Sequence, residues 1–108
     1  MRWTVFMLLK TRPDWLALNR TDRARIAGEA FASALPDDRV RLRYFDAEAF
    51  SGKCTDVAMF ETDDLQAYYF AVERLRDTPL FSHPYFEVVE IIPAMEDGFR
   101  TFEASEAA

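Results

Sequence analysis

Cysteine, histidine and glycine are scarce in this sequence, and each shortage excludes a class of site. Cys54 is the only cysteine, so no disulfide can form within the chain and a cysteine-based zinc site lacks ligands. His83 is the only histidine, and a total of three glycines argues against a glycine-rich loop that holds phosphate. We therefore predict neither a metal site nor a cofactor. A lone cysteine also suits a reducing compartment, which predicts a cytoplasmic protein.

Long hydrophobic runs and an excess of basic charge are also missing. The apolar run from Trp3 to Leu9 ends at Lys10 and is far shorter than the roughly 20 residues that a membrane-spanning helix needs. Nineteen Asp and Glu outnumber thirteen Lys and Arg, and the net charge of −6 repels phosphate backbones and anionic lipid surfaces. We expect no nucleic-acid partner and no membrane association.

Apolar residues, by contrast, are plentiful. Half of the 108 residues are hydrophobic, and the aromatic set comprises ten Phe, four Tyr and two Trp. A chain of this length fits one domain, which we assign to residues 1–108. So much aromatic surface in so small a domain suggests that part of it covers a ligand or a partner.

The order of the periodic segments predicts an α+β fold of the ferredoxin-like βαββαβ type, with an antiparallel four-stranded sheet and two helices on one face. Thr21 is the expected N-cap of the first helix, which ends at Pro36, and Asp63 with Gln66 is expected to open the second, which ends near Asp77. Residues 94–108 are predicted to be a C-terminal tail. The expected strands are Trp3–Lys10, Arg39–Asp46, Thr55–Glu61 and Tyr85–Ile92, the last ended by Pro93.

The second face of this sheet has no helix over it, yet two strands are apolar on both sides. In the first strand Phe6 and Leu8 alternate with Val5, Met7 and Leu9, so both faces carry large apolar side chains. An exposed apolar face of this size favours association. We expect a second copy of the chain to cover it, giving a homodimer built as a dimeric α+β barrel. The alternative is that the C-terminal tail folds back over the same face.

Strand alternation then predicts a pocket on this second face. With Val40, Leu42, Tyr44, Val57, Met59, Val89 and Ile91 assigned to the helix side, Arg43 and Asp56 are expected to pair on the other side. Such a pair either fixes strand register or orients a small ligand. The candidate pocket residues are Arg41, Arg43, Asp56, Glu90, Phe60, Phe86, Phe50 and His83.

Other side chains could also carry chemistry, and each has an ordinary structural alternative. Asp46 and Glu48 could act as general acid and base if their loop folds over a pocket, although loop carboxylates are usually solvated. His83 is suited to proton transfer but lies in a connection beside Pro84. Aromatic residues that suit a cavity wall, or an ordinary core, are Trp15, Tyr44, Phe50 and Tyr69.

Several short runs are distinctive when taken together: Phe45–Ser51, Phe60–Thr62, Asp64–Gln66, Tyr68–Tyr69, Leu75–Asp77 and Pro84–Val88. With these runs the chain resembles the darcynin family of small bacterial proteins, from Trp3 to about Phe102. The resemblance does not assign a catalytic role to any residue of this chain. More loosely, the layout is similar to dimeric α+β-barrel families that include cofactor-free monooxygenases, isomerases, cyclases and haem-handling proteins, an analogy at the level of the fold.

Two functional hypotheses follow. The first is a homodimeric protein that binds a small apolar or aromatic molecule, with a cofactor-free monooxygenase, isomerase or cyclase as the enzyme version. The second is a non-catalytic interaction or sensor module whose second sheet face serves only dimerisation. An enclosed cavity lined by charges and aromatics favours the first.

Overall fold

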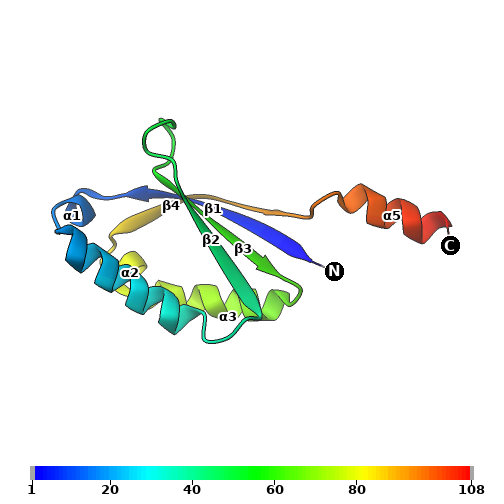
Figure 1. The fold of residues 1–108 in the computed structure, drawn as a ribbon, viewed down its shortest axis with the longest axis horizontal. Helices are drawn as coiled ribbons and strands as arrows, with labels where there is room; N and C mark the ends of the chain where they lie inside the picture. Colours follow the sequence, from blue (N-terminus) through cyan, green and yellow to red (C-terminus); the bar gives the residue numbers. More distant parts are fainter. Residues whose placement is uncertain (1, 108) are drawn as a thin grey trace.

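The computed structural model describes residues 2–107; Met1 and Ala108, the ends of the predicted domain and tail, lie outside the described part. Two long helices, α2 and α3, lie on one side of a four-stranded antiparallel sheet (Figure 1). The strand order β2-β3-β1-β4 is that of a ferredoxin-like fold, which confirms the predicted fold class. The elements are β1 (Trp3–Thr11), α1 (Pro13–Leu16), α2 (Arg20–Ala34), β2 (Val40–Asp46), β3 (Asp56–Thr62), α3 (Leu65–Arg76), α4 (Pro79–Ser82), β4 (Phe86–Ala94) and α5 (Gly98–Ala107).

The long helices start at caps one or two residues away from the predicted ones. Asn19, not Thr21, caps α2, because its side-chain oxygen accepts a hydrogen bond from the backbone N–H of Asp22 at 2.8 Å. Asp64, not Asp63, caps α3 by accepting from the N–H of Ala67 at 3.1 Å. Neighbouring residues of the same chemical type are equally good caps by sequence, so only the backbone geometry distinguishes them.

The facing of β3 is opposite to the prediction. Leu9 pairs with Asp56, Met7 with Ala58 and Val5 with Phe60, and the buried side of β1 faces the helices. Asp56, Ala58 and Phe60 therefore face the helices, while Val57 and Met59 lie on the second face. The alternation of apolar residues did not predict the facing correctly because β3 carries apolar residues on both faces. A shift of one residue in such a strand moves every side chain to the opposite face of the sheet.

An irregularity in β4 changes the facing of its first half. The register with β1 shifts between Leu8 and Leu9, which pair with Glu90 and Val88, so Val89 is the extra residue of a bulge. The bulge turns Phe86 and Val88 toward the helices, whereas the predicted alternation placed them on the second face. Ile91 faces the helices and Glu90 the second face, as predicted.

The fourth strand also continues past Pro93 to Ala94, two residues beyond its predicted end. Proline is compatible with this position because β4 is an edge strand, where a missing N–H costs no ladder bond.

The apolar core lies between the sheet and the helices. Phe60 is 1% exposed and packs edge-on against Tyr68 of α3, with the two ring centroids 5.6 Å apart. Beside it, the buried Thr62 hydroxyl donates to the carbonyl of Arg39 at 2.7 Å and accepts from the N–H of Asp64 at 3.0 Å. These bonds tie the start of β2 to the start of α3, and so fix the end of the sheet that lies away from the site described below.

The predicted tail contains a helix. After β4 the chain turns through Asp97, which has a φ of 46°, and α5 then projects away from the sheet (Figure 1). The alternative in which the tail folds back over its own sheet is therefore not what the structure contains. Among residues 2–107, no helix has the length and apolar character needed to cross a membrane.

Candidate functional site

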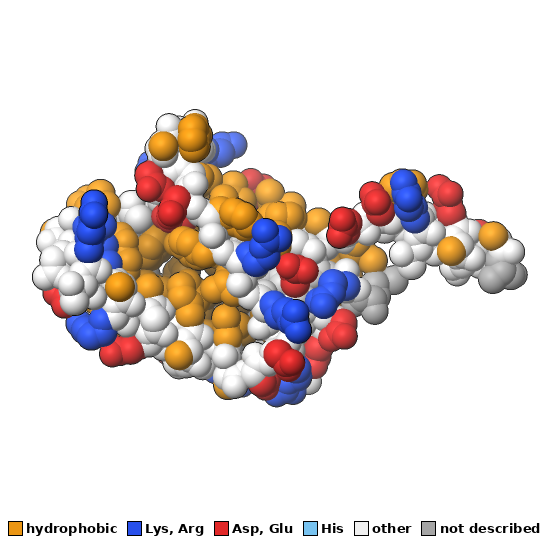
Figure 2. Space-filling view, in the orientation of Figure 1, with side chains coloured by type: hydrophobic (Ala, Val, Ile, Leu, Met, Phe, Trp, Pro, Cys, Tyr) orange, Lys and Arg blue, Asp and Glu red, His pale blue; other side chains and the backbone are white. Residues whose placement is uncertain are grey.

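The largely apolar cavity between the sheet and α2 is the candidate site. It has a volume of about 310 Å³, at the lower end of the range for small-molecule pockets. Figure 2 shows hydrophobic side chains around this hollow and acidic side chains at its border beside the β2–β3 connection. The cavity exists because Ala58 puts a small side chain at the centre of the sheet, while α2 packs chiefly on α3 and α4. Its walls include Met7, Leu9, Trp15, Ala27, Phe31, Phe81 and Phe86.

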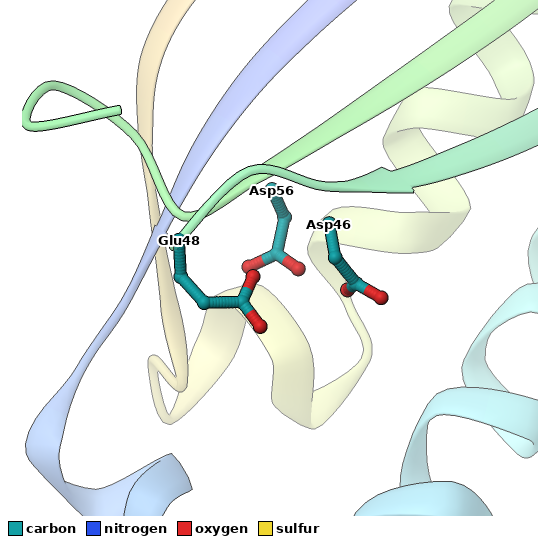
Figure 3. A group of neighbouring side chains, drawn as sticks. All are labelled: Asp46, Glu48 and Asp56. Atoms are coloured by element: carbon teal, nitrogen blue, oxygen red, sulfur yellow. The ribbon is translucent and has the colours of Figure 1, made fainter. Parts of the chain in front are cut away.

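Three carboxylates converge at one end of the cavity. Asp46, at the end of β2, pairs across the ladder with Asp56, at the start of β3, and Glu48 reaches back from the connecting loop (Figure 3). One carboxylate oxygen from each of the three lies within 4.8 Å of the others. Asp56 is 7% exposed, whereas Asp46 and Glu48 are exposed to solvent. This end of the cavity therefore concentrates negative charge at its border.

Asp56 is held in place by its neighbours in the chain. The Thr55 hydroxyl donates to Asp56 Oδ2 at 2.6 Å, and Thr55 is itself fixed by the backbone N–H of Thr11 at 2.9 Å. Burial raises the pKa of Asp56 above its ordinary value, the Thr55 hydrogen bond opposes this rise, and the charges of Glu48 and Asp46 add to it. A carboxyl group of this kind exchanges a proton more readily near neutral pH than a solvated one.

Tyr44 completes the polar end. Its side chain lines the cavity from β2, and its ring meets Phe31 of α2 edge-on at a centroid distance of 5.9 Å. Burial of the hydroxyl, followed by the negative charge of Asp56, raises the pKa of Tyr44, so the phenol stays protonated and can donate a hydrogen bond. Arg23 approaches from α2, but its Nε donates to the carbonyl of Leu18 at 3.1 Å.

Replacing Asp56 with Asn is expected to stabilise the protein at neutral and alkaline pH. Because the folded state raises the pKa of Asp56, its ionisation disfavours folding, and stability is lost as the pH rises through that raised pKa. Asp56→Asn removes the repulsion, so it should unfold in urea with a free energy higher by on the order of 1 kcal/mol at pH 8.

The same difference should shrink toward zero as the pH falls below 3.8, the ordinary pKa of an aspartate, because the wild-type carboxyl is then protonated in both the folded and the unfolded state. Glu61→Gln is the matched control, because Glu61 lies on β3 but on the second face. A pH-independent difference, or an equal effect of the control, would contradict the electrostatic account of this cluster.

The structure divides the predicted pocket residues between the two faces of the sheet. Arg41 and Arg43 pair with Glu61 and Met59 of β3 on the second face, and both arginines are exposed. Asp56 faces the helices, so Arg43 and Asp56 lie on opposite sides of the sheet and the predicted ion pair does not form. Arg43 instead lies over the ring of Phe45, 5.3 Å from its centroid.

The remaining predicted residues separate further. Phe86 lines the cavity, Phe60 is buried in the core next to it, and Glu90 is exposed on the second face. Phe50 is 93% exposed in the β2–β3 loop. His83 is also exposed; its Nε2 lies 2.8 Å from Asp14 Oδ2 and its ring stacks on Tyr85 at 4.0 Å, outside the cavity wall. The position of His83 therefore does not suit a ligand or base for a molecule in the cavity.

Part of the site was visible in the sequence. Trp15 and Tyr44 do line the cavity, and Asp46 and Glu48 do fold toward it, while Phe50 and Tyr69 are exposed. The contribution of α2, through Ala27 and Phe31, was missed. Small residues on the inner side of a helix are the one signal that predicts room beneath it.

The family comparison covers nearly the entire chain. A family model described as darcynin, a domain of unknown function, matches residues 2–108. The chain belongs to the darcynin family. Among curated darcynins, one from Chromobacterium violaceum is 62% identical over 65 residues, which is 60% of this chain and 82% of that protein. Darcynin 1 from Acinetobacter baumannii is 43% identical over 90 residues, 82% of this chain and all of that protein.

The solved structures with the same fold include chlorite dismutases. The enzyme from Candidatus Nitrospira defluvii in complex with imidazole superposes with a TM-score of 0.70 at 19% identity, over 87% of this chain and 40% of that one. A mutant of the same enzyme gives a TM-score of 0.73 at 10% identity, over 98% and 46%. This darcynin thus spans less than half of the chlorite dismutase chains that it matches. At such identities the likeness concerns the fold alone.

Proposed function

We propose that this darcynin is a homodimeric small-molecule-binding protein, and that its ligand is a small apolar or aromatic molecule with a basic group. The observation that carries the proposal is the pairing of an apolar cavity with a carboxylate cluster at one end. The aromatic wall supplies burial for the body of the ligand, and Asp56 with Asp46 and Glu48 supplies the counter-charge for an amine.

The electrostatics of the cluster support a cationic ligand over an anionic one. Three carboxylates meet at the cavity border, and the one arginine that lines the cavity, Arg23, is engaged with a backbone carbonyl. An ammonium group beside Asp56 would lower the raised pKa of that carboxyl and release its proton. Binding should therefore tighten as the pH rises through the pKa of Asp56.

The enzyme version of this proposal uses the same groups. Asp56 is the candidate proton acceptor or donor, since its pKa is raised and it borders the cavity. Tyr44 is the candidate hydrogen-bond donor toward a developing negative charge. The structural relatives carry the name of an enzyme, but at their identity with this chain that name transfers no reaction.

Three probes of similar size test the ligand class: 2-phenylethylamine, 2-phenylethanol and phenylacetate, titrated at pH 7.5 by calorimetry. We expect the amine to bind at least about tenfold more tightly than the alcohol, equivalent to roughly 1.4 kcal/mol, and the carboxylate to bind most weakly. Asp56→Asn should remove the preference for the amine, and Glu61→Gln should keep it.

Equal binding of the alcohol and the amine would contradict the role of the carboxylates. Tight binding of Ca²⁺ or Mg²⁺ alone, with no binding of any organic probe, would assign the cluster to an inorganic cation and overturn the proposal.

The dimer rests on the second sheet face and on the lengths of the structural relatives. Phe6, Leu8, Val57, Met59 and Ile92 lie on that face without a helix over them. The chain covers 46% or less of the chlorite dismutases named above, so two copies have about the length of one such chain. Light scattering at micromolar concentration should give a dimer. A monomer at every concentration would exclude the homodimer, and a dimer that binds no probe would favour the alternative, an interaction or sensor module.

A further inference from the structure

We propose that α5 is an exchanged arm: it docks on the second sheet face of the other copy in the homodimer, at the hollow beside Arg43. The proposal rests on the proposed homodimer and adds the segment that holds it together. It concerns the face of the sheet opposite the ligand cavity.

One side of α5 carries large apolar side chains that are exposed to solvent. Phe99, Phe102, Glu103 and Glu106 follow the i, i+3, i+4, i+7 pattern that places four residues on one side of a helix. The two phenylalanines are 58% and 64% exposed. Figure 1 shows α5 projecting beyond the sheet, and all four of these residues are exposed. A helix of ten residues with two exposed aromatic rings would gain its stability from packing rather than from helix propensity alone.

The second sheet face offers a hollow that matches this side of α5. Its volume is about 380 Å³, and its floor is formed by Phe6 of β1 and Met59 of β3. Arg43 stands at its border, and Arg41 lies two residues away on the same face of β2. Within the described residues, neither arginine makes a salt bridge. Glu61 of β3 and Glu96 also line the hollow, and among the described residues neither forms a salt bridge with Arg41 or Arg43. The hollow thus pairs an apolar floor with a border of mixed charge, on which the two arginines lack a salt-bridge partner.

The apolar parts of the two surfaces are complementary, and the two arginines offer partners for the acidic residues of α5. The phenylalanines of α5 fit an apolar floor, and Glu103 and Glu106, on the same side of the helix, fit Arg41 and Arg43. A charged pair at the border sets the partner and the register, while the buried rings supply most of the affinity. Each ring offers roughly 150–250 Å² when fully buried. Because a two-fold axis uses every contact twice, two arms supply a large share of a standard interface of about 1,600 Å².

The path of the chain favours the other copy over the same copy. Ala94, Met95 and Glu96, which lead into α5, themselves line the hollow. The arm therefore leaves from the edge of its own hollow and would have to reverse direction to lie over it. In the structure it continues outward, away from its own sheet (Figure 1). A helix that extends in this way is free to contact another copy.

The exchange of α5 between two copies can be tested with two charge-reversed variants, measured separately and as a mixture. One variant carries Arg41→Glu and Arg43→Glu; the other carries Glu103→Arg and Glu106→Arg. Each alone places like charges in contact and should weaken the dimer about 10–100-fold in sedimentation equilibrium. In the mixed dimer one interface is wild type and the other is fully reversed, so an equimolar mixture should recover wild-type affinity. Ala104→Arg with Ser105→Arg, at two exposed positions of α5 away from its apolar side, is the control for added basic charge and should dimerise as wild type.

Three other outcomes of this experiment would contradict the proposal, each in a different way. If both variants are weakened and mixing restores nothing, α5 docks on its own sheet and the exchange is wrong. If neither variant is weakened but the wild type is a dimer, α5 is not the contact, and the homodimer stands without it. If the wild type is a monomer, both the proposed homodimer and the proposed exchange of α5 are wrong. The ligand titrations still test the proposed binding of an amine in the cavity. Circular dichroism establishes that each variant is folded.

Discussion

Ala27→Trp is expected to abolish binding of 2-phenylethylamine, with a loss of affinity of about 100-fold or more. Ala27 lines the cavity from α2, and an indole at that position would occupy the space that the ligand body needs. Filling an existing hollow with apolar atoms avoids the strain of overpacking, so the free energy of unfolding should change by less than about 1.5 kcal/mol. Calorimetric titration measures the binding, and urea unfolding measures the stability.

The matched control is Ala32→Trp, which makes the same substitution at an exposed position of the same helix. It should bind the amine as the wild type does. Retained binding by Ala27→Trp would show that the amine binds elsewhere, and would remove the cavity from the proposal while leaving the carboxylate cluster open to a different ligand.

Phe60→Ala is expected to destabilise the fold by about 3–5 kcal/mol, because Phe60 is the largest of the fully buried side chains and its removal leaves a void. The ring contacts Tyr68 of α3 and lies between Val5 and Leu42 on the neighbouring strands. Such a loss is a large part of the total stability of a small domain. The variant should unfold at a much lower urea concentration, at fixed protein concentration.

Phe50→Ala makes the same chemical change at a residue that is 93% exposed, and should alter stability by less than about 0.5 kcal/mol. Comparable losses in the two variants would mean that Phe60 is not in the core, and the facing of β3 would have to be inverted again.

The fold was largely predictable because its signals are local. Four apolar runs, two helical repeats and the turn residues between them specify the order of elements and hence the ferredoxin-like class. The short helices α1 and α4 were not expected, since each is a single turn that begins at a proline within a connection. The helix α5 was not expected either, because its apolar side has only two large residues, Phe99 and Phe102, and both are exposed.

The site was less predictable because it depends on facing and register. Asp56 and Ala58 are poor candidates for the helix side of a strand that also offers Val57 and Met59. Only the pairing with β1 settles that choice, and pairing is a property of two distant segments. The same inversion that moved Asp56 away from Arg43 brought it to Asp46 and Glu48, so one register decides both the absence of the ion pair and the presence of the carboxylate cluster.

Pro93 has a consequence for the way this protein avoids aggregation. The outer edge of β4 is the side of the sheet at which a strand from another molecule could add, and open edges of this kind seed fibres. A proline near the end of the strand and a bulge at Val89 both interrupt the row of donors and acceptors that an added strand requires. Unlimited growth through this edge is thereby disfavoured. In the proposed homodimer, association uses the flat face of the sheet instead, where a two-fold contact closes on itself.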